Sequence, residues 1–315
     1  MALKSNSIAL GLVSVAAFGL ERFEAIEPHM GTMVRVVVYA LDAEHARTAF
    51  RAAFARVAEL DSILSDYRPG SELNRLCEQR SMVVSRDLLR VIEASQRLAG
   101  ESDGAFDITA GPLVRLWREA RKTKALPAPD ALEAARRLTG WRKLTWDAAT
   151  RRVLLAESGM RLDVGAIGKG YAASEALDRI TQSGIASAMV ALSGDIAVSH
   201  PPPGRRGWSI TLELAGGTRD IELRDAAVST AGDSEQFLEM GGVRYSHILD
   251  PRTGIALTRK IAVSVIAPAG LEADGLDTAI SVMGPVRGIE LMKLHPGAWA
   301  VVVTDEGVFE IQRPK

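Results

Sequence analysis

Segments with the patterns of strands and helices follow one another irregularly along this chain, and their order is the strongest constraint on its fold. Residues 33–41 read MVRVVVYAL, a β-branched run typical of a strand. Residues 42–64 carry apolar side chains at helical spacing, including Phe54 and Val57, and Asp42 is placed to cap this helix. The order lacks the strict repeat of a doubly wound parallel sheet, so it predicts an α+β fold.

The same patterns predict the remaining elements. Asp130 and Gly140 are expected to bound one short helix, and Gly100 to end another. Pro285 is expected to interrupt the last helix. Helices are predicted over 87–98, 131–138, 171–183 and 274–294, and strands over 153–156, 188–192, 208–214, 221–223, 261–267 and 299–304. No repeat or low-complexity linker divides these segments, so we predict one compact domain.

The composition is that of an ordinary globular protein with a sizeable core. The 315 residues include 38 Lys and Arg against 39 Asp and Glu, for a net charge of −1. This balance argues against a nucleic-acid partner, so any phosphate chemistry must depend on charges placed locally. Cys77 is the one cysteine, which excludes an intramolecular disulfide.

The N-terminal residues have the pattern of an export signal. Lys4 precedes an apolar run over residues 8–20, and the small residues Ala17 and Gly19 suit a cleavage site just before Leu20. The run is too short to span a bilayer comfortably, and an apolar terminus or an extra strand is the alternative. We therefore predict a signal peptide over 1–20, a mature domain over 21–315 and a periplasmic location. The absence of a nearby cysteine argues against a lipoprotein.

The segment Asp163-Val-Gly-Ala-Ile-Gly-Lys-Gly-Tyr171 is the densest chemical signal. Small residues let a ligand approach the backbone, and Lys169 beside a helix start is suited to an anion. It is not a Walker A loop, because Asp163 replaces its first glycine and Gly170 its Ser or Thr. A dinucleotide fingerprint is a weak match, and a plain turn opening a helix remains the alternative.

A second motif, residues 272–278, supplies oxygen ligands for a metal. Asp274, Asp277 and Thr278 share one face of a helix because they are spaced at i, i+3 and i+4. Oxygen donors without His or Cys favour Mg²⁺ over Zn²⁺. The alternative is an acidic first turn stabilised by the helix dipole.

Three further segments combine reactive or aromatic side chains with turn residues. His247 precedes the turn Asp250-Pro-Arg-Thr-Gly254 and is a candidate general base, although a structural role is equally compatible. Tyr67 and Phe106 lie in two other turn-rich stretches, where they are candidates to pack against a flat heterocycle. Each stretch is also compatible with a loop that packs on its own core.

Taken in order, these motifs resemble those of the ApbE flavin transferase family. The matching segments run from about residue 22 to the C-terminus and are Met30-Gly-Thr32, Ser65-Asp-Tyr67 with Ser71-Glu-Leu73, Gly104-Ala-Phe-Asp107, Asp163-x-Gly165-x-x-x-Lys169-Gly170, His247-Ile-Leu-Asp-Pro-Arg-Thr-Gly254 and Ala273-Asp274 with Asp277-Thr278. One departure is Ser193-Gly194-Asp195, where the family often has Gly-Gly-Asp.

The resemblance implies a single α+β domain with FAD in a central cleft. It assigns flavin contacts to Met30, Tyr67, Ala105, Phe106, Asp107, Asp163, Lys169, His247 and Ile248. It assigns Mg²⁺ to Asp274, Asp277, Thr278 and the backbone carbonyl of Ala166. Catalytic roles fall on Lys169, as the cation at the pyrophosphate, and on His247, as the base.

The implied reaction is Mg²⁺-dependent transfer of FMN from FAD to a Ser or Thr hydroxyl of a target protein, with release of AMP. The implied acceptor is a flavoprotein with a Ser/Thr flavinylation motif, of the respiratory or redox membrane kind. Two alternatives remain from the residues alone: an FAD pyrophosphatase that uses water, and a non-catalytic flavin-binding protein.

Overall fold

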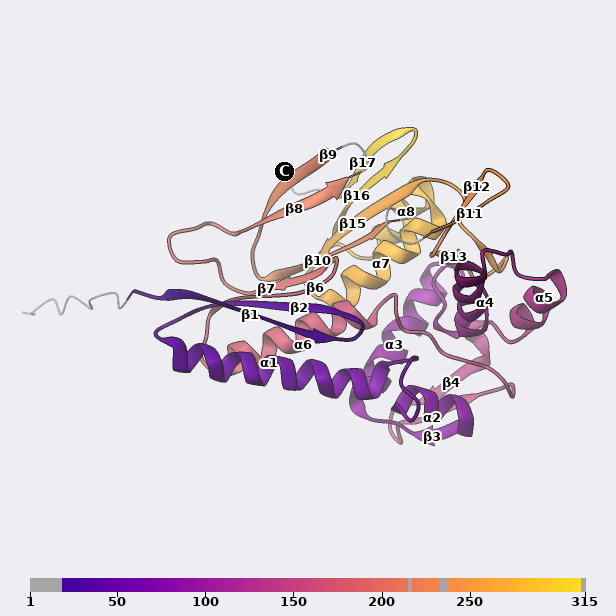
Figure 1. Cartoon of the computed structure of the whole chain (residues 1–315), viewed down its shortest axis with the longest axis horizontal. Helices are drawn as coiled ribbons and strands as arrows, with labels where there is room; N and C mark the ends of the chain where they lie inside the picture. Colours follow the sequence, from indigo (N-terminus) through magenta and orange to yellow (C-terminus); the bar gives the residue numbers. More distant parts are fainter. Residues whose placement is uncertain (1–18, 215–216, 233–236, 313–315) are drawn as a thin grey trace, which may run out of the picture.

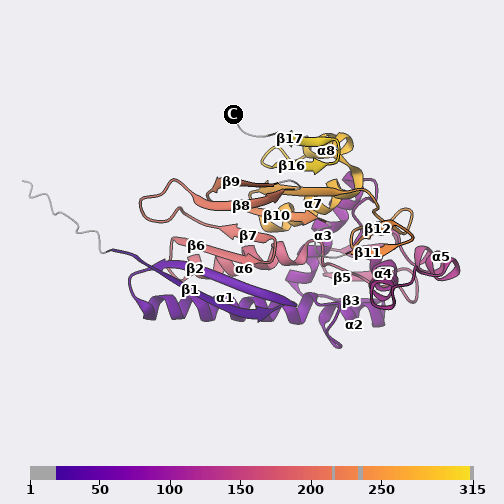
Figure 2. The same ribbon diagram turned by 45° about the horizontal axis from the view of Figure 1, so that its top comes forward.

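An antiparallel sheet of eight strands forms the centre of the computed structural model, which describes residues 19–214, 217–232 and 237–312. In spatial order the strands are β1 (Glu21–His29), β2 (Thr32–Ala40), β6 (Ser187–Leu192), β7 (Asp195–Val198), β10 (Ala226–Gly232), β15 (Ile261–Ala267), β16 (Trp299–Thr304) and β17 (Gly307–Ile311). Figure 2 shows them following one another from β1 beside α1 to β17 beside α8.

The two faces of this sheet have different covers (Figure 1). Helices α1 (Ala43–Leu64), α6 (Gly168–Gln182) and α7 (Gly270–Met283) pack on one face and form the main core with it. The hairpin of β8 (Trp208–Leu214) and β9 (Gly217–Leu223) packs on the other. Side chains alternate between the faces, so Val36 belongs to the helix side and its neighbour Val37 to the hairpin side.

A second group of elements lies at one end of the sheet, on the right in Figure 1. It comprises α2 (Glu72–Gln79), α3 (Arg86–Glu101), α4 (Gly111–Thr123), α5 (Pro129–Arg137), the short helices η1 (Ile108–Ala110) and η2 (Trp141–Lys143), and a small sheet of β3 (Ser81–Val83), β5 (Arg152–Leu155) and β4 (Leu144–Asp147). The remaining elements are the hairpins β11 (Phe237–Met240) with β12 (Val243–Ser246) and β13 (Leu249–Asp250) with β14 (Ile255–Ala256), and helix α8 (Pro285–Met292).

The α+β prediction is confirmed, and several predicted boundaries agree closely with the structure. Strands β15 and β16 have the predicted bounds. Asp42 caps α1 as expected, because its Oδ1 accepts from the backbone N–H groups of Glu44 and His45, each at 2.9 Å.

Other boundaries were predicted wrongly. Gly100 lies inside α3, which continues to Glu101, and α5 begins at Pro129 with Asp130 in its first turn rather than at its cap. Helices α6 and α7 begin three and four residues before the predicted starts, at Gly168 and Gly270. Glycine is a poor helix former, so the sequence pattern favoured a loop at both starts. Gly270 lies where α7 crosses α6, with its backbone against that of Gly170. The sequence patterns also missed β1, α2 and α4.

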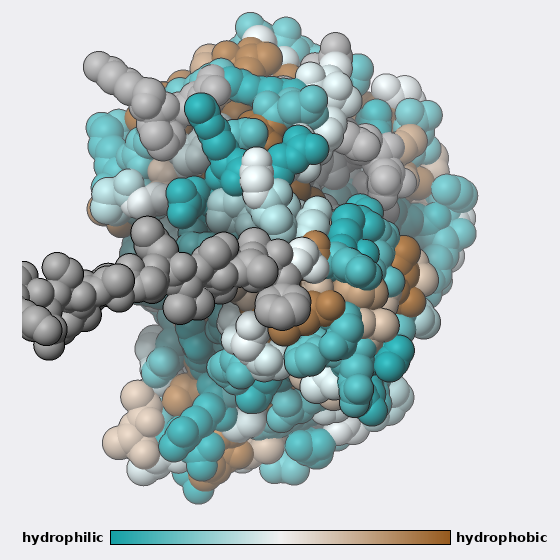
Figure 3. All heavy atoms as spheres, turned by 90° about the vertical axis from the view of Figure 1, so that its left-hand side faces the viewer, coloured by the Kyte–Doolittle hydropathy of each residue, from teal (hydrophilic) through white to brown (hydrophobic). Residues whose placement is uncertain are grey.

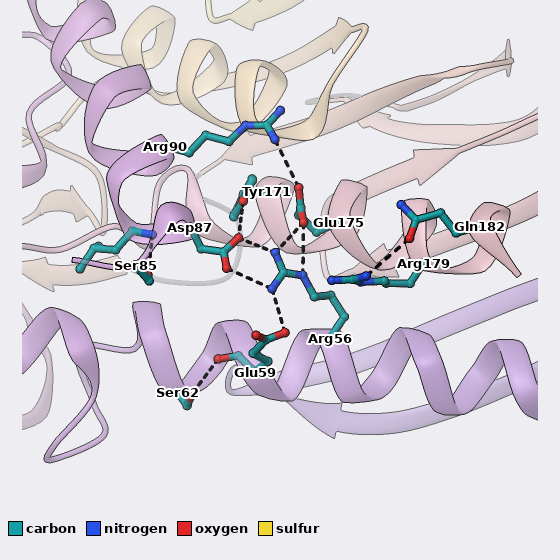
Figure 4. A network of polar contacts seen from close by, with 11 residues as sticks. Arg56, Glu59, Ser62, Ser85, Asp87, Arg90, Tyr171, Glu175, Arg179 and Gln182 are labelled. Carbon is teal, nitrogen blue, oxygen red and sulfur yellow. Dashed lines mark hydrogen bonds and ion pairs between the residues drawn. The ribbon is translucent and has the colours of Figure 1, made fainter. Parts of the chain in front are cut away.

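A buried arginine ties three helices together (Figure 4). Arg56 of α1 donates to Asp87 of α3 and, at 2.6 Å, to Glu175 of α6. The hydroxyl of Tyr171, in the first turns of α6, donates to the same Asp87 at 2.6 Å. This network therefore sets the position of α6 relative to α1 and α3.

The predicted export segment falls on residues 1–20, of which 1–18 lie outside the described part of the chain. In the part that is described, no helix is both long and apolar enough to cross a membrane. The face shown in Figure 3 is mostly hydrophilic, with apolar side chains in small separate groups.

Candidate active site

One large cleft, of about 1330 Å³, gathers the residues singled out in the sequence. Its wall includes segments that are far apart along the chain, from the β1–β2 turn to α7. All thirteen residues assigned to the flavin or the metal line it: Met30, Tyr67, Ala105, Phe106, Asp107, Asp163, Ala166, Lys169, His247, Ile248, Asp274, Asp277 and Thr278. The volume exceeds that of a typical drug-sized pocket, so a dinucleotide has room there.

The crossing of α6 and α7 brings Lys169 close to Asp274. A Cβ atom on Gly170 would collide with the backbone carbonyl of Gly270 and lie 2.6 Å from the Asp274 Cβ. The glycines therefore allow a helix contact that any larger residue would prevent. As a result, the backbone N–H of Gly170 donates to Asp274 Oδ2 at 2.9 Å.

A chain of polar contacts joins the lysine to the second aspartate of α7. Lys169 Nζ donates to Asp195 Oδ2 at 2.8 Å. The Ser229 hydroxyl lies 2.6 Å from both Asp195 Oδ1 and Asp277 Oδ2. Asp277 Oδ1 in turn accepts from Thr278 Oγ1 at 3.2 Å. Asp195, Ser229, Asp274 and Asp277 are each at most 4% exposed, so this cluster is almost shielded from water.

The cluster holds more negative charge than its lysine can balance. Three carboxylates face one ammonium, and Ser229 has only one proton to donate to its two acceptors. Burial and the charge of Asp195 raise the pKa of Asp274 to about 7. Burial and the charge of Asp274 likewise raise the pKa of Asp277 well above its usual range. A divalent cation is the counter-charge that such a set of oxygens fits.

The geometry sets a limit on how such a cation is held. No group of three or more His, Cys, Asp or Glu side chains within the described ranges is arranged to hold a metal. A cation here would therefore rely on the two carboxylates of α7, the Thr278 hydroxyl, the carbonyl of Ala166 on the same wall, and oxygens of its ligand.

A second group of side chains surrounds Tyr67. Tyr67 is 73% exposed, and the Arg118 guanidinium lies 4.4 Å from the centroid of its ring. Phe106, in contrast, is 2% exposed and packs in the core, with part of its surface on the cleft wall, and its contact with a heterocycle stays a prediction. Asp107 uses Oδ1 to cap η1, accepting from the Thr109 N–H at 2.8 Å and from its hydroxyl at 2.7 Å.

Two tight turns place Met30 and His247 on the wall. Met30 and Gly31 form the two-residue loop between β1 and β2, with φ angles of 50° and 73°. His247 lies between β12 and β13, just ahead of the turn that Asp250 closes by accepting from the Gly254 N–H at 2.8 Å. The Trp117 indole of α4 donates to the Gly254 carbonyl at 2.9 Å and so fixes this turn.

Sequence reasoning missed the roles of three residues. Asp195 was noted only as part of the Ser193-Gly194-Asp195 motif, although a carboxylate where one apolar strand turns into the next was a usable signal of a buried polar site. Ser229 and Arg118 gave no local signal, because a serine in a strand and an arginine in a helix are ordinary.

Together these features define an α+β protein with one large cleft. The wall of the cleft carries a buried cluster of one lysine and three aspartates, and a tyrosine that is held against an arginine.

Comparison with known proteins identifies the family. The sequence matches the ApbE family over residues 30–303, and the chain belongs to that family. A FAD:protein FMN transferase of Treponema pallidum is 33% identical over 307 residues, covering 90% of this chain and 85% of that protein. One from Vibrio cholerae is 34% identical over 265 residues, covering 80% and 78%. The apo flavinyl transferase ApbE of Pseudomonas stutzeri has a TM-score of 0.83 at 30% identity, covering 94% of this chain and 96% of that one.

Proposed function

We propose that this chain is a flavin transferase that moves FMN from FAD to an acceptor protein. The observation that carries the proposal is the buried Lys169–Asp195–Ser229–Asp277 chain beside Asp274, within a cleft of dinucleotide size. Family membership supports the same reaction. We propose further that transfer requires Mg²⁺, uses a Ser or Thr hydroxyl of the acceptor and releases AMP.

The residues of the cluster have separate parts in this mechanism. Asp274, Asp277, Thr278 and the Ala166 carbonyl would hold Mg²⁺, which supplies Lewis-acid neutralisation of the pyrophosphate. Lys169 places a second positive charge against the same phosphates. Burial opposes its ammonium form, but Asp195 and Asp274 outweigh burial and raise its pKa, so it stays charged.

The acceptor oxygen attacks the FMN-side phosphorus in line with the bond to AMP. A P–O bond to the acceptor forms as the P–O bond to AMP breaks, and the hydroxyl proton passes to His247. His247 lines the cleft and is our candidate base. Positioning and charge stabilisation supply most of the rate in phosphoryl transfer.

The deciding experiment separates a protein acceptor from water. The purified protein is incubated with FAD, Mg²⁺ and a candidate acceptor, and the acceptor is analysed by mass spectrometry. We expect covalent FMN on one Ser or Thr, none when EDTA replaces Mg²⁺, and none on an acceptor with that residue changed to Ala. Free FMN and AMP with an unmodified acceptor would indicate a pyrophosphatase instead. Redox flavoproteins of the membrane are the acceptors to test first.

Replacing Lys169 with Met should lower FAD affinity and the transfer rate together by about ten- to a hundredfold. A charge-assisted hydrogen bond is worth about 1.5–3 kcal/mol, and the charge on the phosphates shifts during the reaction. Isothermal titration with FAD and a single-turnover assay measure the two contributions. If both stay within about twofold of wild type, which is well under 1 kcal/mol, Lys169 does not act at the pyrophosphate.

Two controls accompany this variant. Lys122→Met removes an exposed cation of α4 and should have no effect. The paired change Lys169→Met with Asp195→Asn removes the buried carboxylate that the single change leaves without its lysine. A thermal melt of each variant then separates loss of folding from loss of FAD binding.

We also propose that the protein is exported, with residues 1–20 as its signal. Protein purified from the native host should begin near residue 20, because the apolar run over residues 8–20 follows Lys4 and ends in small residues. N-terminal sequencing of the periplasmic fraction measures this. Recovery of the intact N-terminus from the cytoplasm would refute export.

A further inference from the structure

The ring of Tyr67 is held from one side by a cation. The Arg118 guanidinium lies 4.4 Å from the ring centroid, a distance at which a cation is attracted to an aromatic face. Tyr67 is nevertheless 73% exposed as a residue. A planar ligand therefore has access to Tyr67 while Arg118 occupies one of its faces.

Arg118 is itself fixed by two carboxylates from different parts of the chain. It forms an ion pair with Asp66, the neighbour of Tyr67, and another with Asp163 at 2.7 Å. The three side chains are between 10% and 22% exposed, so water screens these contacts only in part. One arginine of α4 thus joins the loop of residues 65–71, here called the Tyr67 loop, to the segment that leads into α6.

The Tyr67 loop has a second internal support. The side-chain amide of Asn74 donates to the carbonyls of Ser65, Asp66 and Arg68, at 3.3, 3.1 and 3.0 Å. Asn74 is 7% exposed and lies in α2, so the loop is held against a helix. The loop conformation is therefore set by the protein, before any ligand is present.

Helix α4 also holds the segment around His247, which is likewise predicted to contact the flavin. Trp117, the neighbour of Arg118, fixes the Gly254 carbonyl by its indole N–H and lies 5.3 Å from the Tyr245 ring, measured between centroids. These contacts hold β12, before His247, and the β13–β14 turn, after it. Two adjacent residues of α4 consequently support both the Tyr67 and the His247 parts of the wall.

We propose that Arg118 is a positioning residue that holds Tyr67 as a rigid platform for the isoalloxazine ring of FAD. The proposal rests on the proposed flavin-transferase function and adds to it how the protein holds the ring of Tyr67 before FAD binds. Arg118 acts through Tyr67: in the described part of the chain its ion pairs are with Asp66 and Asp163, whereas Lys169 pairs with Asp195.

The test compares Arg118→Met and Arg118→Lys with wild type. Titration with FAD, followed by visible circular dichroism of the flavin, reports affinity and ring stacking together. Arg118→Met should weaken FAD binding about tenfold, because FAD must then order the Tyr67 ring that the cation–π contact holds in wild type, and should reduce the flavin signal. The KM for FAD should rise similarly while kcat changes less than about threefold. Arg118→Lys should recover part of the signal, since it keeps the charge but not the two-pronged pairing.

A double-mutant cycle shows whether Arg118 works through the tyrosine. In a Tyr67→Leu background, Arg118→Met should cause no further loss of FAD affinity. Arg115→Met is the matched control, because Arg115 is an exposed residue one turn earlier in α4 that does not line the cleft. A thermal melt reports folding, and if Arg118→Met does not fold, Arg118→Lys alone carries the comparison.

The outcomes distinguish this inference from the proposed function. Wild type that binds FAD with a flavin signal, together with Arg118→Met of unchanged affinity and signal, overturns the inference and leaves the function standing. Equal losses from Arg118→Met in the wild-type and the Tyr67→Leu backgrounds also overturn it. Wild type that neither binds FAD nor gives a flavin signal overturns the function and the inference with it.

Discussion

Replacing Asp274 with Ala should abolish FMN transfer while the protein stays folded. Asp274 is 4% exposed and lies in the cleft beside the Lys169–Asp195 pair. As a proposed metal ligand, its removal should cost more than the roughly 10–100-fold loss typical of residues that only support ligands. The transfer assay at saturating FAD and Mg²⁺ measures the effect, and full activity of the variant would refute the metal assignment.

Asp274→Asn separates a metal role from a structural one. It keeps an oxygen for the Gly170 N–H and removes the charge. The pKa of Asp274 is raised to about 7, so its charged form costs stability as pH rises from the unfolded value of 3.8 through 7. The variant should therefore melt no lower than wild type without metal. Above pH 7, Mg²⁺ should raise the melting temperature of wild type but not of the variant.

If Asp274→Asn keeps the transfer activity that Asp274→Ala loses, the role of Asp274 is to support the helix crossing and not to bind a metal. Asp130→Ala serves as the matched control, since Asp130 is an exposed carboxylate in the first turn of α5. It should retain both transfer and the response of the melting temperature to Mg²⁺.

Replacing Arg56 with Met should lower the free energy of unfolding by about 3–5 kcal/mol, the range for removing one partner of a buried ion pair. Its side chain is 6% exposed, and those of Asp87 and Glu175 are 18% and 17% exposed. Burial disfavours the Arg56 cation, but hydrogen bonds to Asp87 and Glu175 outweigh this and raise its pKa. Without Arg56, two poorly hydrated carboxylates face each other. Chemical denaturation measures the loss.

The matched control for Arg56 is Arg51→Met on the same helix. Arg51 is exposed, and its side chain contacts Thr48 at 3.4 Å, so its loss should cost less than about 0.5 kcal/mol. None of Arg56, Asp87 and Glu175 lines the cleft, so the folded fraction of Arg56→Met should still bind FAD. A loss below about 1 kcal/mol would contradict a stabilising role for this network.

Many helices and strands could be predicted from the sequence because they depend on interactions between residues that are close together in the chain. The strand at residues 261–267 is a run of β-branched and small residues, and the Asp42 cap depends on N–H groups only two and three residues away. Errors arose where distant contacts override local preference. Gly170 and Gly270 are poor helix formers, yet both lie in helices, where they allow the close crossing of α6 and α7.

The candidate site divides in the same way. The sequence alone determined the family, the α+β class and the residues that bear the proposed chemistry, since motifs such as 272–278 keep their chemistry within a few positions. The tertiary structure decided which of them meet. Arg118 lies 52 positions from Asp66, and Ser229 lies 48 positions from Asp277. Such pairs have no periodic signal in one sequence, because their contact is created by the packing of whole elements and not by the chain between them.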